Sequence, residues 1–104
     1  MLDKSEVREI VNRYLVEIKK VIEPNAVLIF GSYINGNPHE YSDIDVAIIV
    51  EGFNGDWYDT MVELGKLRHK VSFEIEPHLL DPLHDRSGFV EHVLKTGEYI
   101  YKAA

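Results

Sequence analysis

The run of apolar residues from Ala26 to Phe30, followed at once by Gly31 and Ser32, is the feature that most constrains the fold. The run is rich in branched side chains and is too short for a stable helix, so it predicts a β-strand that is buried on both faces. Such a strand needs a packed layer on each side of its sheet. We therefore expect an α/β (or α+β) fold, in which helices pack on a small mixed β-sheet.

Two further segments have strand patterns, and three have apolar residues at helical spacing. The predicted strands are 43–50 and 71–76, and the predicted helices are 5–22, 56–70 and 86–96. Ser5 is the expected N-cap of the first helix, Gly97 the C-cap of the last, and Pro77 the end of the third strand. A brief helical turn and a loop are expected from Ser32 to Tyr41, and a short extended tail over 99–101.

The length and composition of the chain set its class. With 104 residues there is room for one domain, so we expect 1–104 to form a single domain. Hydrophobic residues make up 45% and charged residues 28%, which argues against intrinsic disorder. The absence of cysteine argues against a disulfide framework and a thiolate zinc site, so the cytoplasm is the expected location. No stretch reaches the roughly 20 apolar residues that span a bilayer, so no membrane span is expected. Acidic residues within MLDKSEVREIV keep any apolar run at the N-terminus well short of secretory length, so no standard export signal is expected.

The excess of acidic residues limits the kind of partner. Eighteen acidic and eleven basic residues give a formal charge of −7, so the chain should repel a bare phosphate backbone. Tight nucleic-acid binding by charge alone is therefore not expected. Phosphates can still bind if divalent cations lie between them and the carboxylates.

The turn at Gly31 and Ser32 predicts an anion site. A buried strand that turns directly into a helix leaves backbone N–H groups unpaired, and Gly31 has no Cβ to block a ligand. The helix N-terminus contributes partial positive charge and Ser32 contributes a hydroxyl donor. The terminal phosphates of a nucleotide are a suitable ligand for such a turn.

Asp43 and Asp45 form a second candidate site. Residues two apart in a strand point to the same face, with Cα atoms roughly 6.6 Å apart, so the two carboxylates can converge on one cation. Oxygen ligands of this kind suit Mg²⁺ or Mn²⁺. Further along the strand the same face carries Ala47 and Ile49, which predicts that the polar end is local and lies where the sheet opens to solvent.

A third carboxylate is needed to hold a second metal ion or to take a proton from an acceptor hydroxyl. Glu74 and Glu76 would share one face of the strand predicted at 71–76. Adjacent strands lie about 4.8 Å apart, which is within carboxylate reach of the Asp pair. The sequence leaves open which of the two glutamates is used, and both are also consistent with the solvated face of an edge strand.

Together these residues resemble a known signature. Gly31-Ser32, three residues, Gly36, and then Ser42-Asp43-Ile44-Asp45-Val46 resembles the motif of the nucleotidyltransferase superfamily that includes DNA polymerase beta. With its short length, the chain is most similar to the minimal nucleotidyltransferases, or MNT proteins. The similarity covers 26–76, and the order of elements extends it to the full length.

The resemblance implies a polymerase beta-like fold and an Mg²⁺-dependent reaction, with Mn²⁺ as the alternative cation. A nucleoside monophosphate, expected to be AMP from ATP, would pass to a protein or RNA hydroxyl with release of pyrophosphate. Gly31 and Ser32 would hold the terminal phosphates, Asp43 and Asp45 the metal, and Glu74 or Glu76 would supply the third catalytic and metal-binding carboxylate.

The same resemblance implies a partner. Proteins of this group are often paired with a small helical HEPN protein, and some act as antitoxins that modify a tyrosine of it. The alternative is an antitoxin that neutralises a helical partner by binding alone, with the Asp pair idle.

Tyr33, Ile34 and Asn35 stand where many members carry arginines, which predicts a weaker phosphate clamp. The sequence leaves open the acceptor and the preferred base. It also leaves open whether the chain is a monomer or an oligomer.

The histidines and tyrosines are expected to be surface or packing residues. The five histidines have no metal-ligand spacing and receive no role: His39, His69, His78, His84 and His92. The tyrosines are expected to pack or to form an interface. Tyr33 is the exception, because its place beside the predicted phosphate site would let it stack on a ligand or shield it.

Overall fold

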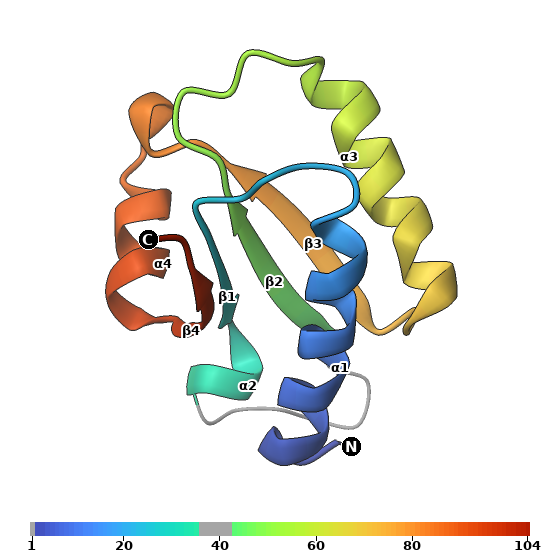
Figure 1. The fold of residues 1–104 in the computed structure, drawn as a ribbon. Coiled ribbons are helices and arrows are strands. Elements are labelled where there is room, and N and C mark those ends of the chain that lie inside the picture. The colour runs from blue at the N-terminus through green and yellow to red at the C-terminus, as the bar shows by residue number, and fades with distance from the viewer. Residues whose placement is uncertain (1, 36–42) are drawn as a thin grey trace.

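A computed structural model describes residues 2–35 and 43–104 of the chain, apart from the side chain of Asn35. Figure 1 shows the order of elements: α1 (Lys4–Ile18), β1 (Ala26–Phe30), α2 (Ser32–Asn35), β2 (Ile44–Ile49), α3 (Trp57–Lys66), β3 (Ile75–Leu80), α4 (Phe89–Thr96) and β4 (Glu98–Lys102). Two short 3₁₀ helices follow α3 and β3: η1 (Leu67–Lys70) and η2 (Pro82–His84). This arrangement confirms the predicted α/β fold.

The four strands form one mixed sheet in the order β3-β2-β1-β4. Strand β1 pairs antiparallel with both β2 and β4, whereas β2 and β3 are parallel. The predicted run from Ala26 to Phe30 is the inner strand β1, and all of its residues except Phe30 are buried. Its apolar composition follows from this position, because each face of the strand is covered by side chains.

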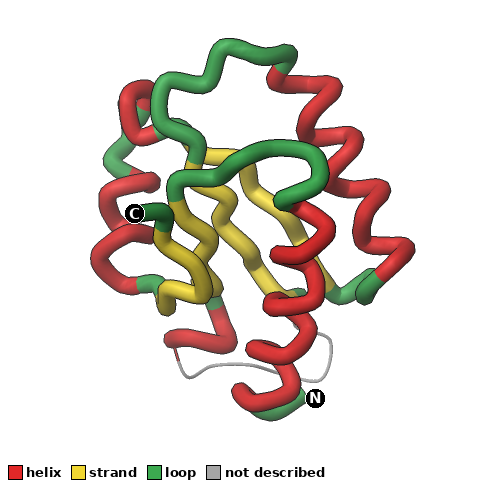
Figure 2. Tube along the Cα trace, viewed as in Figure 1, coloured by secondary structure: helices red, strands yellow, loops and turns green. Residues whose placement is uncertain are grey.

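Helices cover both faces of the sheet (Figure 2). Helices α1 and α3 lie on one face, where buried residues of α1 and Leu64 of α3 pack against alternate strand residues such as Val46 and Ile48. Helix α4 lies on the other face, where Val90 and Val93 pack against a strip that includes Ala47 and Ile49. The alternation of side chains along each strand divides the core into these two layers.

Helix α1 begins and ends earlier than predicted. Its N-cap is Asp3 rather than Ser5, because Oδ1 of Asp3 accepts the backbone N–H of Glu6 at 2.8 Å. The helix ends at Ile18 and continues only as hydrogen-bonded turns. Within the ranges that the structure describes, neither this helix nor any other has the length and apolarity to cross a membrane.

The third strand lies further along the chain than predicted. It begins at Ile75, not at 71, and it continues through Pro77 to Leu80. Pro77 is tolerated because β3 is an edge strand, so its backbone has a hydrogen-bonding neighbour on one side only. The position of β3 is set by its parallel pairing with β2, in which Ile44 is the partner of Ile75 and Asp45 that of Glu76.

The segment predicted as an extended tail is a full strand of the sheet. Strand β4 pairs with β1, and Val27 is the partner of Tyr101. Gly97 is the C-cap of α4, as predicted, but its φ of −76° is an ordinary extended conformation. Glycine is required there by space, since a Cβ would lie 2.8 Å from the carbonyl oxygen of Val93 and 3.1 Å from that of Ile29.

Asp81 fixes the loop at the end of β3. Only 4% of this residue is exposed, and its carboxylate accepts backbone N–H groups of Gly52, Phe53 and Leu83 at 2.9–3.1 Å. Burial alone would raise the pKa of Asp81, but the three donors outweigh burial and hold that pKa below its ordinary value. The turn after β2 is thereby tied to the end of β3.

Candidate active site

The candidate site is the open end of the sheet face that α4 covers. Along this face the inner strands present Phe30 of β1 and Asp45 of β2 as register partners, and Glu76 of β3 is the partner of Asp45. Ala47 and Ile49, further along β2, are buried against α4. Polar groups therefore occupy one end of a face that is otherwise apolar, which confirms the arrangement predicted for this strand.

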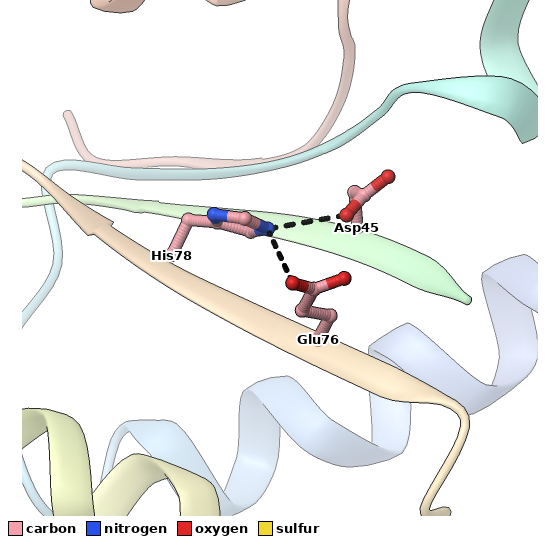
Figure 3. A group of neighbouring side chains, drawn as sticks. All are labelled: Asp45, Glu76 and His78. Atoms are coloured by element: carbon pink, nitrogen blue, oxygen red, sulfur yellow. Dashed lines mark hydrogen bonds and ion pairs between the residues drawn. The ribbon is translucent and has the colours of Figure 1, made fainter.

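Three side chains converge at this end: Asp45, Glu76 and His78 (Figure 3). Nε2 of His78 lies 3.1 Å from Oδ1 of Asp45 and 4.0 Å from Oε1 of Glu76. One potential ligand atom from each residue lies within 4.8 Å of the other two. The side chains are partly accessible, with 24% of Asp45, 53% of Glu76 and 30% of His78 exposed, so a ligand can reach all three from solvent.

The position of His78 was missed at the level of sequence. Its ring packs edge-on against Phe30, with 5.0 Å between ring centroids, and Phe30 packs in the same manner against Phe89 of α4 at 5.7 Å. These aromatic contacts hold the imidazole at the border between the apolar and polar parts of the face. The spacing Glu76-Pro77-His78 would have placed His78 beside Glu76 if the strand had been predicted to continue through the proline.

Gly31 and Asp45 link the two halves of the sequence motif. Gly31 has φ +79°, a backbone conformation that residues with a side chain rarely adopt. A Cβ on this residue would collide with Oδ2 of Asp45 and lie 3.2 Å from its Cγ. The backbone of the predicted phosphate turn is therefore in direct contact with the carboxylate predicted to bind metal.

Helix α2 begins at Ser32, as predicted, and forms a single turn in which Ile34 N–H donates to the carbonyl oxygen of Gly31 at 3.0 Å. Ser32 is partly exposed. Tyr33 is only 3% exposed and belongs to the core beneath α1, so it is a packing residue and is not available to stack on a ligand.

Asp43 and Glu74 lie outside the convergent cluster. Asp43 is exposed and precedes the first residue of β2, and Glu74 is exposed and precedes the first residue of β3. The carbonyl oxygen of Glu74 accepts the N–H of Ile44 at 2.7 Å, which fixes its backbone beside that of β2. Of the two candidate glutamates, the structure brings Glu76 to Asp45. The remaining motif residues, Gly36 and Ser42, and also His39 lie outside the described residues.

The cluster has the donor set of a divalent cation site. Two carboxylates this close repel each other, and a cation that both oxygens contact removes the repulsion. Two ligand atoms at about 2.1 Å from one ion and at right angles are about 3 Å apart, close to the observed separation of His78 Nε2 and Asp45 Oδ1. The residues therefore fit a bound cation that solvent can reach.

The fold is that of a nucleotidyltransferase domain. Residues 12–104 match the family described as polymerase beta, nucleotidyltransferase. The chain therefore belongs to this family.

Two relatives carry names that specify an activity. "Putative protein adenylyltransferase MJ0126" of Methanocaldococcus jannaschii is 34% identical over 79 residues, which cover 76% of this chain and 67% of that protein. "Putative protein adenylyltransferase MJ1215" of the same organism is 39% identical over 44 residues, which cover 42% of this chain and 51% of that protein. The matched region thus spans about half of one relative and two thirds of the other.

Solved structures show the same fold. A structure described as a putative nucleotidyltransferase from Sulfolobus solfataricus has a TM-score of 0.68 and 20% identity, and the alignment covers 93% of this chain and 81% of that one. A second structure, described as a toxin-antitoxin with AMP-PNP, has a TM-score of 0.65 and 22% identity, with 92% of this chain and 73% of that one covered. At this level of identity the similarity concerns the fold.

Proposed function

We propose that this chain is a divalent-cation-dependent adenylyltransferase that transfers AMP from ATP to a hydroxyl group of a protein or RNA. The observation that carries the proposal is the contact between the Gly31 turn and Asp45, whose register partner is Glu76. A triphosphate on that turn would lie next to the carboxylates. Family membership and relatives named as protein adenylyltransferases support this choice of reaction.

In the proposed reaction the acceptor oxygen forms a bond to the α-phosphorus of ATP. The bond from that phosphorus to the bridging oxygen of the β-phosphate breaks, and pyrophosphate leaves. The proton of the acceptor hydroxyl passes to a carboxylate, for which Glu76 is better placed than Glu74. Gly31 and Ser32 orient the terminal phosphates so that the leaving group lies opposite the attacking oxygen.

Asp45 and Glu76, together with Asp43 just before β2, are the residues that would hold Mg²⁺ or Mn²⁺. A bound cation would neutralise charge on the phosphates and lower the pKa of the attacking hydroxyl. It would also allow a chain with a formal charge of −7 to bind a polyanion.

The proposed acceptor is a small helical protein of the HEPN type, which AMP transfer would neutralise. One structure with this fold is described as a toxin-antitoxin, which supports an antitoxin role. The competing function is neutralisation by binding alone, and it predicts that the carboxylates are dispensable.

The test compares ATP labelled on the α-phosphate with ATP labelled on the γ-phosphate, each incubated with Mg²⁺, the chain and a candidate partner or cell extract. Label should pass to a macromolecule from the α position only, because the proposed reaction transfers a nucleotide. Digestion with protease or ribonuclease then identifies the acceptor class. Asp45→Asn should abolish labelling, and Glu76→Gln should lower the rate by orders of magnitude.

Glu74→Gln is the matched control, since it removes an equal charge two residues away and should have a small effect. If the wild-type chain labels nothing, while the wild-type and Asp45→Asn chains neutralise a partner equally well, the binding-only function replaces the transferase.

A further inference from the structure

We infer that His78 is a ligand to the cation of this site through Nε2, and that this nitrogen gives the site a preference for first-row transition ions such as Mn²⁺ over Mg²⁺. The inference rests on the proposed function in one respect, because the proposed function places the cation at Asp45 and Glu76. It adds a ligand that the motif does not contain and a consequence for the choice of metal.

The geometry favours coordination by His78. Nε2 points toward both carboxylates, and the other ring nitrogen lies on the far side of the imidazole (Figure 3). Nε2 lies 3.1 Å from Oδ1 of Asp45 and 4.0 Å from Oε1 of Glu76, and at both separations two atoms can contact the same cation. As a metal ligand, Nε2 must be unprotonated, so a neutral ring that binds the cation would carry its proton on Nδ1.

The surroundings of the ring also favour a ligand role. Phe30 packs against the imidazole, and the pairing of Ala47 with His78 fixes the backbone beneath it. Only 30% of the side chain is exposed, and the contact with Phe30 limits movement of the ring. A preorganised donor of this kind loses less entropy on binding a metal than a free surface histidine does.

The choice of ion follows from the ligand atom. Carboxylate and water oxygens suit Mg²⁺, whereas imidazole nitrogen suits later divalent ions, whose affinity for nitrogen-containing sites rises along the first transition row. Mg²⁺ also gives up its bound water reluctantly. Replacement of one carboxylate or water oxygen by His78 Nε2 should therefore strengthen Mn²⁺ binding more than Mg²⁺ binding.

The decisive measurement is pulsed electron paramagnetic resonance of Mn²⁺ bound to the wild-type chain. Coordination by His78 predicts a nitrogen hyperfine coupling, and this coupling should disappear in His78→Gln while Mn²⁺ binding persists at higher concentration. His92→Gln is the matched control, because His92 is exposed on α4 and should not affect the signal.

Binding constants for MnCl₂ and MgCl₂ provide the second measurement. His78→Gln should weaken Mn²⁺ binding by roughly 10–100-fold, the scale seen when groups that support a metal site are removed, and should weaken Mg²⁺ binding much less. Melting curves recorded in the presence of a chelator show whether His78→Gln is folded. The nitrogen coupling is measured on the wild-type chain, so that result holds even if the variant does not fold.

Three results would overturn the inference. The first is a wild-type chain that binds Mn²⁺ without a nitrogen coupling, while Asp45→Asn no longer binds Mn²⁺. The second is an equal loss of both ions in His78→Gln, which would make His78 a positioning residue for Asp45. The third is the absence of binding by either ion, which would also remove the metal from the proposed function. A nitrogen coupling without AMP transfer would contradict the proposed reaction alone.

Discussion

Gly31 and Asp45 are in such close contact that a Cβ atom on residue 31 would collide with Oδ2 of the carboxylate. The two residues come from the ends of neighbouring antiparallel strands, because Gly31 follows Phe30 and Phe30 is the register partner of Asp45. A glycine at the phosphate turn therefore serves two purposes. It adopts the left-handed backbone conformation, and it leaves the space that the carboxylate fills.

The first prediction separates these two purposes of Gly31. The left-handed backbone conformation should make Gly31→Ala and Gly88→Ala each cost about 1–2 kcal/mol of folding stability, because both glycines have φ +79°. Gly31→Ala should cost more than Gly88→Ala, because its Cβ also collides with Asp45. Only Gly31→Ala should also abolish the stabilisation of the native state by Mn²⁺ or Mg²⁺, since a Cβ on Gly88 would meet no atom of the described residues within 4 Å. Thermal melting with and without cation measures both effects. An equal cation response in the two variants would contradict the role of the Gly31 contact.

Ser32 provides a test of the phosphate turn. Ser32→Ala should weaken binding of a non-hydrolysable ATP analogue by about 1–2 kcal/mol, the worth of one hydroxyl hydrogen bond to a charged group, without loss of fold. Ser87→Ala is the control, because the Ser87 hydroxyl accepts the N–H of Phe89 near the start of α4. Calorimetric titration gives both affinities. Equal affinities of wild type and Ser32→Ala would remove this hydroxyl from the phosphate site.

Substitution by alanine is expected to have opposite effects on folding stability at Gly97 and at Gly65. Gly97→Ala should destabilise the fold by about 1–3 kcal/mol, because the new Cβ meets two backbone carbonyl oxygens that cannot move freely. Gly65→Ala should stabilise it by roughly 0.5–1 kcal/mol, since Gly65 lies in α3 and a Cβ there meets no atom within 4 Å in the part of the chain that the structure describes. Urea titration measures both changes. A neutral Gly97→Ala variant would show that β1 and α4 are less closely packed than described.

The acid sensitivity of the fold should depend on Asp81. The pKa of this carboxyl is lowered in the folded chain, so its contribution to stability is present above the ordinary value of 3.8 and is lost as the pH falls through the lowered value. Asp81→Asn should therefore show a smaller fall in melting temperature than the wild-type chain between pH 5 and pH 2. Asp56→Asn, which alters an exposed carboxylate that accepts one backbone N–H, should change this pH dependence less. An Asp81→Asn variant with the wild-type pH profile would contradict the prediction.

The sequence was sufficient to predict the central strand and the polar end of β2. The run from Ala26 to Phe30 has no polar residue, and its bounds coincide with β1. The alternation after Asp45 likewise predicts a local polar end, because Ala47 and Ile49 are apolar and share the face of Asp45, and in the fold both pack under α4. In both cases the decisive information lies within a few residues of the chain.

The misplaced third strand shows where local information fails. Val71 to Glu76 alternates well, and Pro77 is an expected terminator, so the pattern favoured a strand that ends before His78. The actual limits of β3 depend on its pairing with β2 and on its position at the sheet edge, neither of which is a local property. This error in the bounds of β3, together with the lack of metal-ligand spacing among the histidines, explains why the sequence pattern gives His78 no role in the candidate site.

The parallel pairing of β2 and β3 also has a consequence for the order in which the chain folds. Strands β1 and β2 meet as antiparallel neighbours, but Glu76 reaches Asp45 only after the chain has crossed over through α3. Contacts between distant parts of a chain form later and more slowly than local ones. A folding intermediate that contains only the β1–β2 pair would thus hold Asp45 without Glu76 and His78. Cation binding would then begin only when β3 has paired with β2. Substitutions in α3 that slow the crossover should delay cation binding, although α3 contributes no residue to the cluster of Asp45, Glu76 and His78.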